Sequence, residues 1–250
     1  MLCKLSCFSP EMAAFLLIPG AWHGSWCWAY LTPLLEKAGH SVITPELAPI
    51  PPGANPLPLW TRQITELIQN APDPLILLGH SRGGMVMSEV AAHCPGQIRA
   101  LIYLSGLLLP EGETMQSTMA RPEAGGEPDY LRPARGRCLS ILPAAIIPLF
   151  YHLAPFSLAQ AAASQLHPEP IGTFSAPSTI RSSQLADIPK FYIECQEDRA
   201  IPLALQRAMQ AALPCTEVFS LNADHSPFIS QPLMLAALLS DITTKLFYRL

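Results

Sequence analysis

The sequence has 250 residues, of which half are hydrophobic and only 14% are charged, so the chain can bury a large core as one α/β domain. A net charge of −4 without any basic run argues against a nucleic-acid partner, and no apolar stretch of the sequence is long enough to span a membrane. The seven cysteines are scattered without a C-x-x-C pair, which indicates reduced thiols of a cytoplasmic protein. No metal-ligand spacing is present, and we expect neither a metal nor a cofactor.

Strand and helix patterns alternate through the first hundred residues. Apolar runs and helical periodicity predict strands over 13–18, 41–44, 75–78 and 98–104, and helices over 26–37, 59–70 and 85–92. Such alternation predicts a mostly parallel sheet flanked by helices, with catalytic groups on the loops at the carboxyl ends of the strands.

The alternation stops after residue 106 and resumes at residue 187. Residues 107–186 are rich in glycine and proline and contain apolar stretches that predict short helices over 139–152 and 157–166. We therefore expect a helical cap over 107–186, inserted into a core made of residues 12–106 and 187–250; the alternative is an ordinary run of surface helices. The core ends with a strand over 190–195, a helix over 202–213, a strand over 216–221 and a helix over 228–247, and residues 1–11 form an N-terminal extension.

The stretch from Gly79 to Gly83 fits the pattern G-x-S-x-G, with Ser81 at its centre. A wholly apolar strand precedes it and a helical pattern follows it, which is the context that a nucleophile elbow requires. The glycines leave room for a sharp turn, and the turn raises the serine hydroxyl from the edge of the sheet. The alternative is a glycine-rich turn in which Ser81 is a passive helix cap.

A serine nucleophile needs a histidine base and an acid, which follow it in this chain order in such folds. His225 lies in the loop between the last strand and the last helix, and Asp198 follows the strand over 190–195. Both loops leave the same edge of the sheet, so we assign His225 as the base and Asp198 as the acid, with Glu197 as the fallback. The alternatives are a surface or capping histidine, and an aspartate that only caps the next helix.

Acyl transfer also needs hydrogen-bond donors for the oxyanion. One is the backbone N–H of Arg82, which follows the nucleophile, and the other should come from the loop after the first strand. Pro19 has no N–H, and Gly20 allows close approach, so Ala21 is the second candidate. The side chain of Arg82 is expected to form an ordinary surface salt bridge.

Four stretches, 17–28, 79–84, 197–202 and 223–226, resemble the α/β-hydrolase superfamily, and more narrowly its branch of plant methyl-ester esterases, hydroxynitrile lyases and bacterial esterase relatives. The likeness covers most of the chain and is weakest over 107–186, where 150–152 and 166–170 look like cap segments of the bacterial members. The resemblance implies an α/β-hydrolase fold, a triad of Ser81, Asp198 and His225, and oxyanion donors at Ala21 and Arg82.

The chain departs from these relatives at Pro19, where many of them have a histidine before the glycine. The needed N–H lies two residues further on, so we expect activity to survive this change. The lyases of the branch have a threonine at the position of Gly20 and a lysine after the catalytic histidine, where this chain has Ser226. Without that lysine nothing would stabilise a departing cyanide, which argues against a lyase.

These observations predict a cofactor-free serine carboxylesterase that cleaves a small, mostly apolar ester through an acyl-enzyme. Gly20, Trp22 and His23 are the candidate pocket residues. A lactonase or another Ser-His-Asp hydrolase is the alternative within enzymes, and a non-catalytic ligand receptor is the alternative outside them; dehalogenases and epoxide hydrolases would need an aspartate at position 81. We expect a small-molecule ester as the partner, with no nucleic acid or membrane, and the sequence leaves a homodimer open.

Overall fold

A sheet of six parallel strands runs through the centre of the molecule, in the order β2-β1-β3-β4-β8-β9. The computed structural model describes residues 12–69, 71–126 and 128–248, so the predicted extension over 1–11 lies outside the described residues. The strands are β1 (Ala14–Ile18), β2 (Ser41–Ile43), β3 (Leu75–His80), β4 (Ile98–Leu104), β8 (Lys190–Cys195) and β9 (Glu217–Leu221). The central strand β3 is buried along its whole length, as expected for an apolar run covered on both faces.

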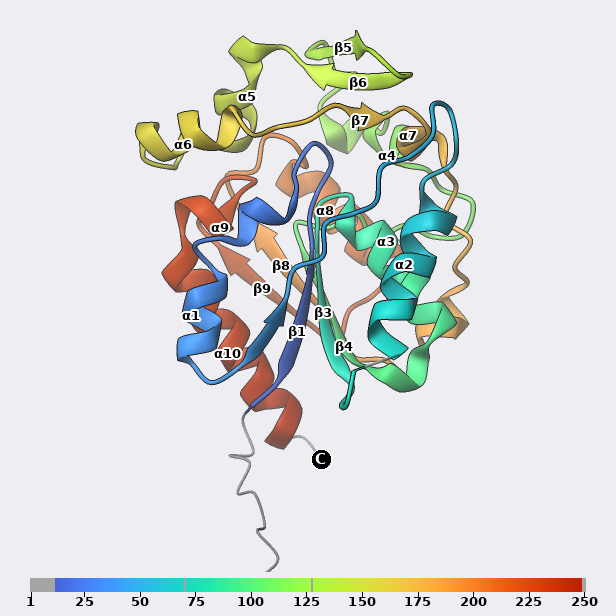
Figure 1. Ribbon diagram of the computed structural model, residues 1–250, viewed down its shortest axis with the longest axis vertical. Helices are drawn as coiled ribbons and strands as arrows, with labels where there is room; N and C mark the ends of the chain where they lie inside the picture. The colour runs from blue at the N-terminus through green and yellow to red at the C-terminus, as the bar shows by residue number, and fades with distance from the viewer. Residues whose placement is uncertain (1–11, 70, 127, 249–250) are drawn as a thin grey trace, which may run out of the picture.

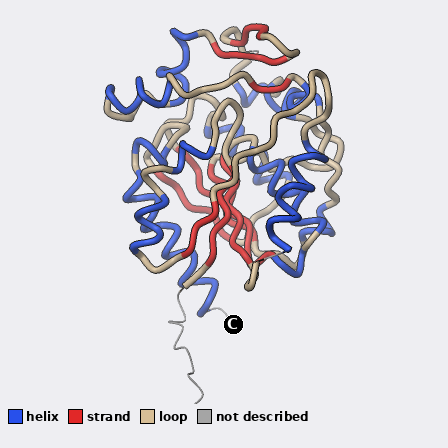
Figure 2. The backbone as a smooth tube through the Cα atoms, in the orientation of Figure 1, coloured by secondary structure: helices blue, strands red, loops and turns tan. Residues whose placement is uncertain are grey.

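Helices cover both faces of this sheet, with α1 and α10 on one face and α2 and α3 on the other (Figures 1 and 2). Their bounds, with those of the remaining core helices, are η1 (Ser25–Trp28), α1 (Thr32–Lys37), α2 (Leu57–Gln69), α3 (Gly83–His93), η2 (Pro95–Gln97), α8 (Leu203–Ala212), α9 (Pro227–Ser230) and α10 (Pro232–Tyr248). The fold is the predicted mostly parallel sheet flanked by helices. No helix in the described ranges combines the length and the apolar character needed to cross a bilayer.

Two predicted helices are each divided in the structure. The helix predicted over 26–37 consists of the 3₁₀ helix η1 and the separate helix α1, which has a proline in its first turn. The helix predicted over 228–247 is divided into α9 and α10, and α10 begins at Pro232. Proline is favourable in the first turn of a helix but unfavourable further along it, because it lacks an N–H and crowds the carbonyl four residues earlier.

Residues 107–186 are here called the cap segment: the part from α4 to α7 lies over the carboxyl ends of the strands, and the part after α7 returns beside α3, where η4 packs, to the amino end of β8 (Figure 1). Their helices are α4 (Met115–Met119), η3 (Pro122–Ala124), α5 (Pro143–Phe150), α6 (Phe156–Ala163), α7 (Gly172–Ser175) and η4 (Ser182–Leu185), and their strands are β5 (Leu131–Ala134), β6 (Cys138–Ile141) and β7 (Glu169–Pro170). The three strands form a small antiparallel sheet in the order β5-β6-β7.

The small sheet corrects the helix predicted over 139–152 in the cap, because residues 139–141 belong to β6 and the helix α5 begins only at Pro143. β6 pairs with β5 through a tight turn in which Gly136 and Arg137 have positive φ angles of 74° and 57°. It also pairs with β7, far along the chain, and such pairing leaves no local pattern in the sequence. The extent of residues 107–186 as a separate folding unit stays a prediction.

Candidate active site

Ser81 lies at the turn between β3 and α3, with a backbone φ of 52°. A positive φ is unusual for a residue other than glycine and marks a strained turn. The turn needs its glycines: a Cβ at Gly79 would lie 2.7 Å from the carbonyl carbon of Gly83, and one at Gly83 would collide with the carbonyl oxygen of Ile18. The strand–turn–helix geometry that the G-x-S-x-G pattern predicts is therefore present around Ser81.

His225 and Asp198 meet at the same edge of the sheet, on the loops that follow β9 and β8. The Nδ1 of His225 lies 2.7 Å from the Oδ2 of Asp198. The other carboxylate oxygen of Asp198 accepts the N–H groups of Ala200 and Ile201, both at 2.8 Å, and the hydroxyl of Ser105 donates to Oδ2. With Nδ1–H donated to the carboxylate, the Nε2 of His225 is the acceptor of the ring.

The other carboxylates near these loops lie elsewhere. Asp224, the neighbour of His225 in sequence, accepts the N–H of Leu153 at 2.9 Å and so connects the cap segment to this loop. Glu197, the fallback acid, is exposed, and Asp187 is exposed ahead of β8, at the opposite end of the strand. The side-chain carboxylate that contacts the His225 ring is therefore that of Asp198.

His80 holds the backbone of His225 from behind. The Nε2–H of His80 donates to the carbonyl oxygen of His225 at 2.8 Å, and the two rings lie 4.5 Å apart between centroids. Burial lowers the pKa of His80 well below its ordinary value, so its ring stays neutral. On the cavity side the ring of Phe150 stacks on that of His225 at 5.4 Å.

The two candidate oxyanion donors, the N–H groups of Ala21 and Arg82, lie on segments that approach each other closely. A Cβ at Gly20 would lie 2.9 Å from the Cβ of Ser81, which places the loop after β1 directly against the elbow. Within the part of the chain that the structure describes, neither N–H donates to another residue. Both are therefore available to a developing oxyanion.

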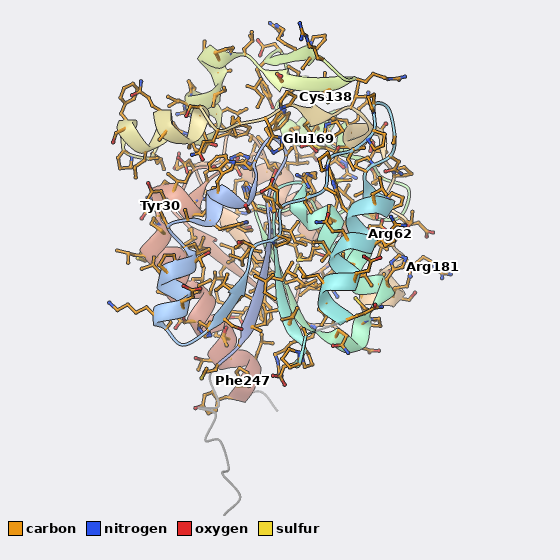
Figure 3. All side chains as sticks on the ribbon, in the orientation of Figure 1. Tyr30, Arg62, Cys138, Glu169, Arg181 and Phe247 are labelled. Atoms are coloured by element: carbon orange, nitrogen blue, oxygen red, sulfur yellow. The ribbon has the colours of Figure 1, made fainter. Side chains whose placement is uncertain are left out.

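The prediction for the side chain of Arg82 is wrong: it is buried at 1% exposure and forms no surface salt bridge. Its Nη2 donates to the carbonyl oxygen of Gly20 at 2.8 Å, and its Nε lies 3.3 Å from the Oε1 of Glu169 in β7. The guanidinium also stacks over the ring of Trp60, 4.4 Å from its centroid. Figure 3 shows Glu169 between the small sheet of the cap segment and the strand ends below.

A cavity of about 340 Å³ opens between these loops and the cap segment, and both Ser81 and His225 line it. No hydrogen bond joins the Ser81 hydroxyl to any residue that the structure describes. The other lining residues are mostly apolar, and none of those described is a lysine, arginine, aspartate or glutamate: Trp22, Met115, Gln116, Met119, Ala120, Pro128, Tyr130, Leu131, Leu139, Phe150, Ile171, Phe174, Ala200 and Ile201. Such a lining suits an uncharged, apolar ligand.

Of the three candidate pocket residues, Trp22 lines the cavity and Gly20 and His23 lie behind its wall. His23 is buried, with its Nδ1–H donating to the carbonyl of Ala21 at 2.8 Å and its Nε2 accepting the hydroxyl of Tyr151 at 2.7 Å. Burial lowers the pKa of His23 to about 3. His23 therefore supports the loop from inside and does not face a ligand.

Ser105 and Glu169 are among the residues of this arrangement whose contacts were not predicted. Ser105 directly follows β4 at the carboxyl edge of the sheet, so its position gave a signal of the kind that identified Asp198. Glu169 gave none, because its contact with Arg82 joins two segments far apart in sequence. No group of three or more His, Cys, Asp or Glu side chains suited to a metal ion occurs among the described residues.

Comparison with known proteins gives consistent results. The model of the family described as "Alpha/beta hydrolase family" matches residues 15–238. The pyrethroid hydrolase of Sphingobium wenxiniae is 32% identical over 241 residues, which cover 90% of this chain and 86% of that protein. Methylesterase 7 of Arabidopsis thaliana is 29% identical, over 92% of this chain and 96% of the relative.

A solved structure shares the same architecture. The crystal structure of a pyrethroid hydrolase from Sphingobium faniae superimposes with a TM-score of 0.80 at 30% sequence identity, covering 93% of this chain and 98% of the other. The similarity extends over nearly the whole of both chains, so it includes the cap segment as well as the sheet.

Proposed function

The chain belongs to the alpha/beta hydrolase family, and from this premise we propose a serine carboxylesterase in which Ser81 is the nucleophile, His225 the general base and Asp198 the partner of that base. The observation that carries the assignment is the hydrogen bond between His225 Nδ1 and Asp198 in the wall of the cavity that Ser81 also lines. The relatives are named as hydrolases and esterases, which supports the reaction class.

The reaction follows from the geometry in two halves. The Nε2 of His225 takes the Ser81 proton as Oγ attacks the ester carbonyl, and the backbone N–H groups of Ala21 and Arg82 receive the negative oxygen. When the tetrahedral intermediate collapses, the alcohol leaves with the proton from His225, and the acyl group stays on Ser81. Water then repeats the sequence, with His225 as its base, and releases the carboxylic acid.

The cavity supports a small, mostly apolar ester as the substrate. The rings of Trp22 and Phe150 lie 5.9 Å apart in the cavity wall, and the cap segment supplies most of the other lining residues. Because the described lining has no fixed charge, a charged acyl or alcohol group would lose its hydration without gaining a partner. A cytoplasmic location stays part of the proposal, supported by the free, scattered cysteines of the described chain.

The test is Ser81→Ala, assayed with p-nitrophenyl butyrate and a panel of esters and lactones of different chain lengths. We expect turnover to fall by about 10⁴-fold or more, because the nucleophile is removed. Ser220→Ala, which removes a hydroxyl bonded to Glu194 away from the cavity, is the matched control and should keep normal activity. Full activity of Ser81→Ala would reject the proposal, and a wild-type protein that binds esters without repeated turnover would identify a receptor instead.

A further inference from the structure

The side chain of Arg82 binds the peptide unit that carries the second oxyanion donor. Its Nη2 donates to the carbonyl oxygen of Gly20, and that carbonyl and the N–H of Ala21 belong to one planar, trans peptide group. In such a group the C=O and N–H bonds point in opposite directions. Fixing the carbonyl of Gly20 on the guanidinium therefore fixes the direction of the Ala21 N–H.

Glu169 binds the next peptide of the same loop. Its Oε2 accepts the N–H of Trp22 at 3.1 Å, while its Oε1 lies against Arg82. Trp22 has a positive φ of 63°, a conformation that a bulky residue adopts only when its surroundings hold it there. Two further contacts from the cap segment hold it: the indole N–H of Trp22 donates to the carbonyl of Leu139 at 2.9 Å, and the N–H of His167 donates to the carbonyl of Trp22 at 3.0 Å.

We propose that the Arg82 side chain and Glu169 are positioning residues of the oxyanion hole, a buried ion pair that aligns the Ala21 N–H from both sides. The inference rests on the proposed function, because it assumes that Ala21 and Arg82 are the oxyanion donors. Arg82 then has two roles: its backbone supplies one donor, and its side chain orients the other. Glu169 connects this alignment to the cap segment that walls the cavity.

Burying the charges of Arg82 and Glu169 costs solvation free energy, which favours a functional role for the pair over a role in packing alone. The side chains of Arg82 and Glu169 are 2% and 1% exposed, and a charge removed from water is tolerated only where partners compensate for it. The hydrogen-bond partners of this pair are the carbonyl of Gly20 and the N–H of Trp22, on either side of Ala21, and the ring of Trp60 packs against the guanidinium. A charged donor on a carbonyl also polarises its peptide group, which strengthens the N–H at the other end as a donor.

Arg82→Met tests the side chain while keeping the backbone N–H of residue 82. We expect kcat to fall about 10- to 100-fold with KM changed less than threefold, because the misaligned donor is used mainly in the transition state. The inhibition constant of an apolar trifluoromethyl ketone, whose hemiketal oxygen occupies the oxyanion hole, should rise by the same factor as kcat/KM falls. The binding of the alcohol product should not change.

Glu169→Gln and the double variant Arg82→Met/Glu169→Gln separate alignment from charge burial. Glutamine can still accept the Trp22 N–H but leaves the guanidinium without a counter-ion, so the single variant should lose stability and part of kcat. The double variant contains no lone buried charge and should have the kcat of Arg82→Met, since the two residues act through one contact. If Arg82→Met does not fold, kcat and the ketone inhibition constant are measured in the double variant and in Arg82→Lys instead. Lysine keeps the charge but lacks the planar guanidinium.

All rates are expressed per site titrated with a fluorophosphonate, so that a merely unfolded fraction does not count as lost kcat. Arg62→Met, which breaks an exposed Arg–Glu pair on α2, is the control and should have wild-type kcat (Figure 3). A kcat per titrated site within twofold of wild type in the folded Arg82 variants, with an unchanged ketone inhibition constant, would overturn the inference. Failure of the proposed function would be recognised separately, as normal turnover in Ser81→Ala.

Discussion

The carboxyl edge of the sheet and the cap segment hold their residues in different ways. At the sheet edge, the loops that carry Ser81, Asp198 and His225 each leave a strand of one continuous parallel ladder, so the ladder sets their separation. The cap segment has short helices and a three-stranded sheet of its own, and it reaches the sheet edge through individual side chains such as Glu169. The positions of Ser81, Asp198 and His225, the proposed triad, therefore depend on the sheet, whereas the cavity and the loop after β1 also depend on a few contacts from the cap segment.

The largest effect is expected at the sheet edge, from Asp198→Asn. The amide cannot hold the His225 ring with Nδ1 protonated or stabilise the imidazolium that forms, so kcat should fall about 10⁴-fold. Steady-state ester hydrolysis measures this, with Asp187→Asn, an exposed residue at the opposite end of β8, as the control. A loss below tenfold would show that the sheet edge does not hold the acid we assign.

The next effect concerns the pH dependence of stability and arises where the cap segment contacts the loop after β1. His23, buried and neutral, lies at this contact and is hydrogen-bonded to Tyr151 of the cap segment. Its pKa of about 3 in the folded protein lies below the ordinary value of 6.5, so the unfolded chain binds more protons between these values. The stability that neutral His23 contributes is therefore fully present above about pH 6.5 and is lost as the pH drops, by about 2 kcal/mol at pH 5. Burial lowers the pKa of His80 and His40 too, which adds to the fall.

Urea unfolding at pH 8, 6.5 and 5, followed by tryptophan fluorescence, measures this loss. The variant His23→Gln removes the titrating ring and should make the decline between pH 8 and pH 5 shallower. An equally steep decline of the unfolding free energy in that variant would mean that His23 does not contribute to the acid sensitivity of the fold.

A smaller effect is expected from Ser105→Ala, which removes one donor from the Asp198 carboxylate and keeps its contact with His225. We expect kcat to fall about tenfold, because a charge-assisted hydrogen bond that orients the acid is lost. Ser220→Ala removes a serine–carboxylate bond of the same kind, to Glu194, and should leave kcat unchanged. Equal activity of the two variants would show that the sheet edge tolerates a looser acid.

The smallest effect is expected in the cap, from Met119→Ala. The shorter side chain gives up apolar contact only with large substrates, so KM for a naphthyl valerate should rise about 3- to 5-fold while KM for the acetate stays the same. Met234→Ala, an exposed methionine on α10, is the control. An equal change for both esters would assign Met119 to the folding of the cap and not to the selection of the substrate.

The same contrast explains what could be predicted from the sequence. The sheet, its strands and the position of Ser81 have local patterns: an apolar run, two glycines at fixed spacing and a following helix. Asp198 and His225 could be proposed because parallel strands end at one edge. The burial of Arg82 could not be predicted, because it depends on Glu169 and Trp60, which the chain brings to Arg82 only when both the cap and α2 have packed.

Strands β4 and β8 pair with each other in the sheet, although the whole cap segment lies between them in the chain. A different cap, inserted between the end of β4 and the start of β8, would therefore leave the backbone hydrogen bonds between the strands of the sheet intact. It would, however, leave Arg82 with an uncompensated positive charge unless it also supplied an acid where Glu169 lies. A replacement cap for this chain must therefore supply a carboxylate at the place of Glu169, as well as a wall for the cavity.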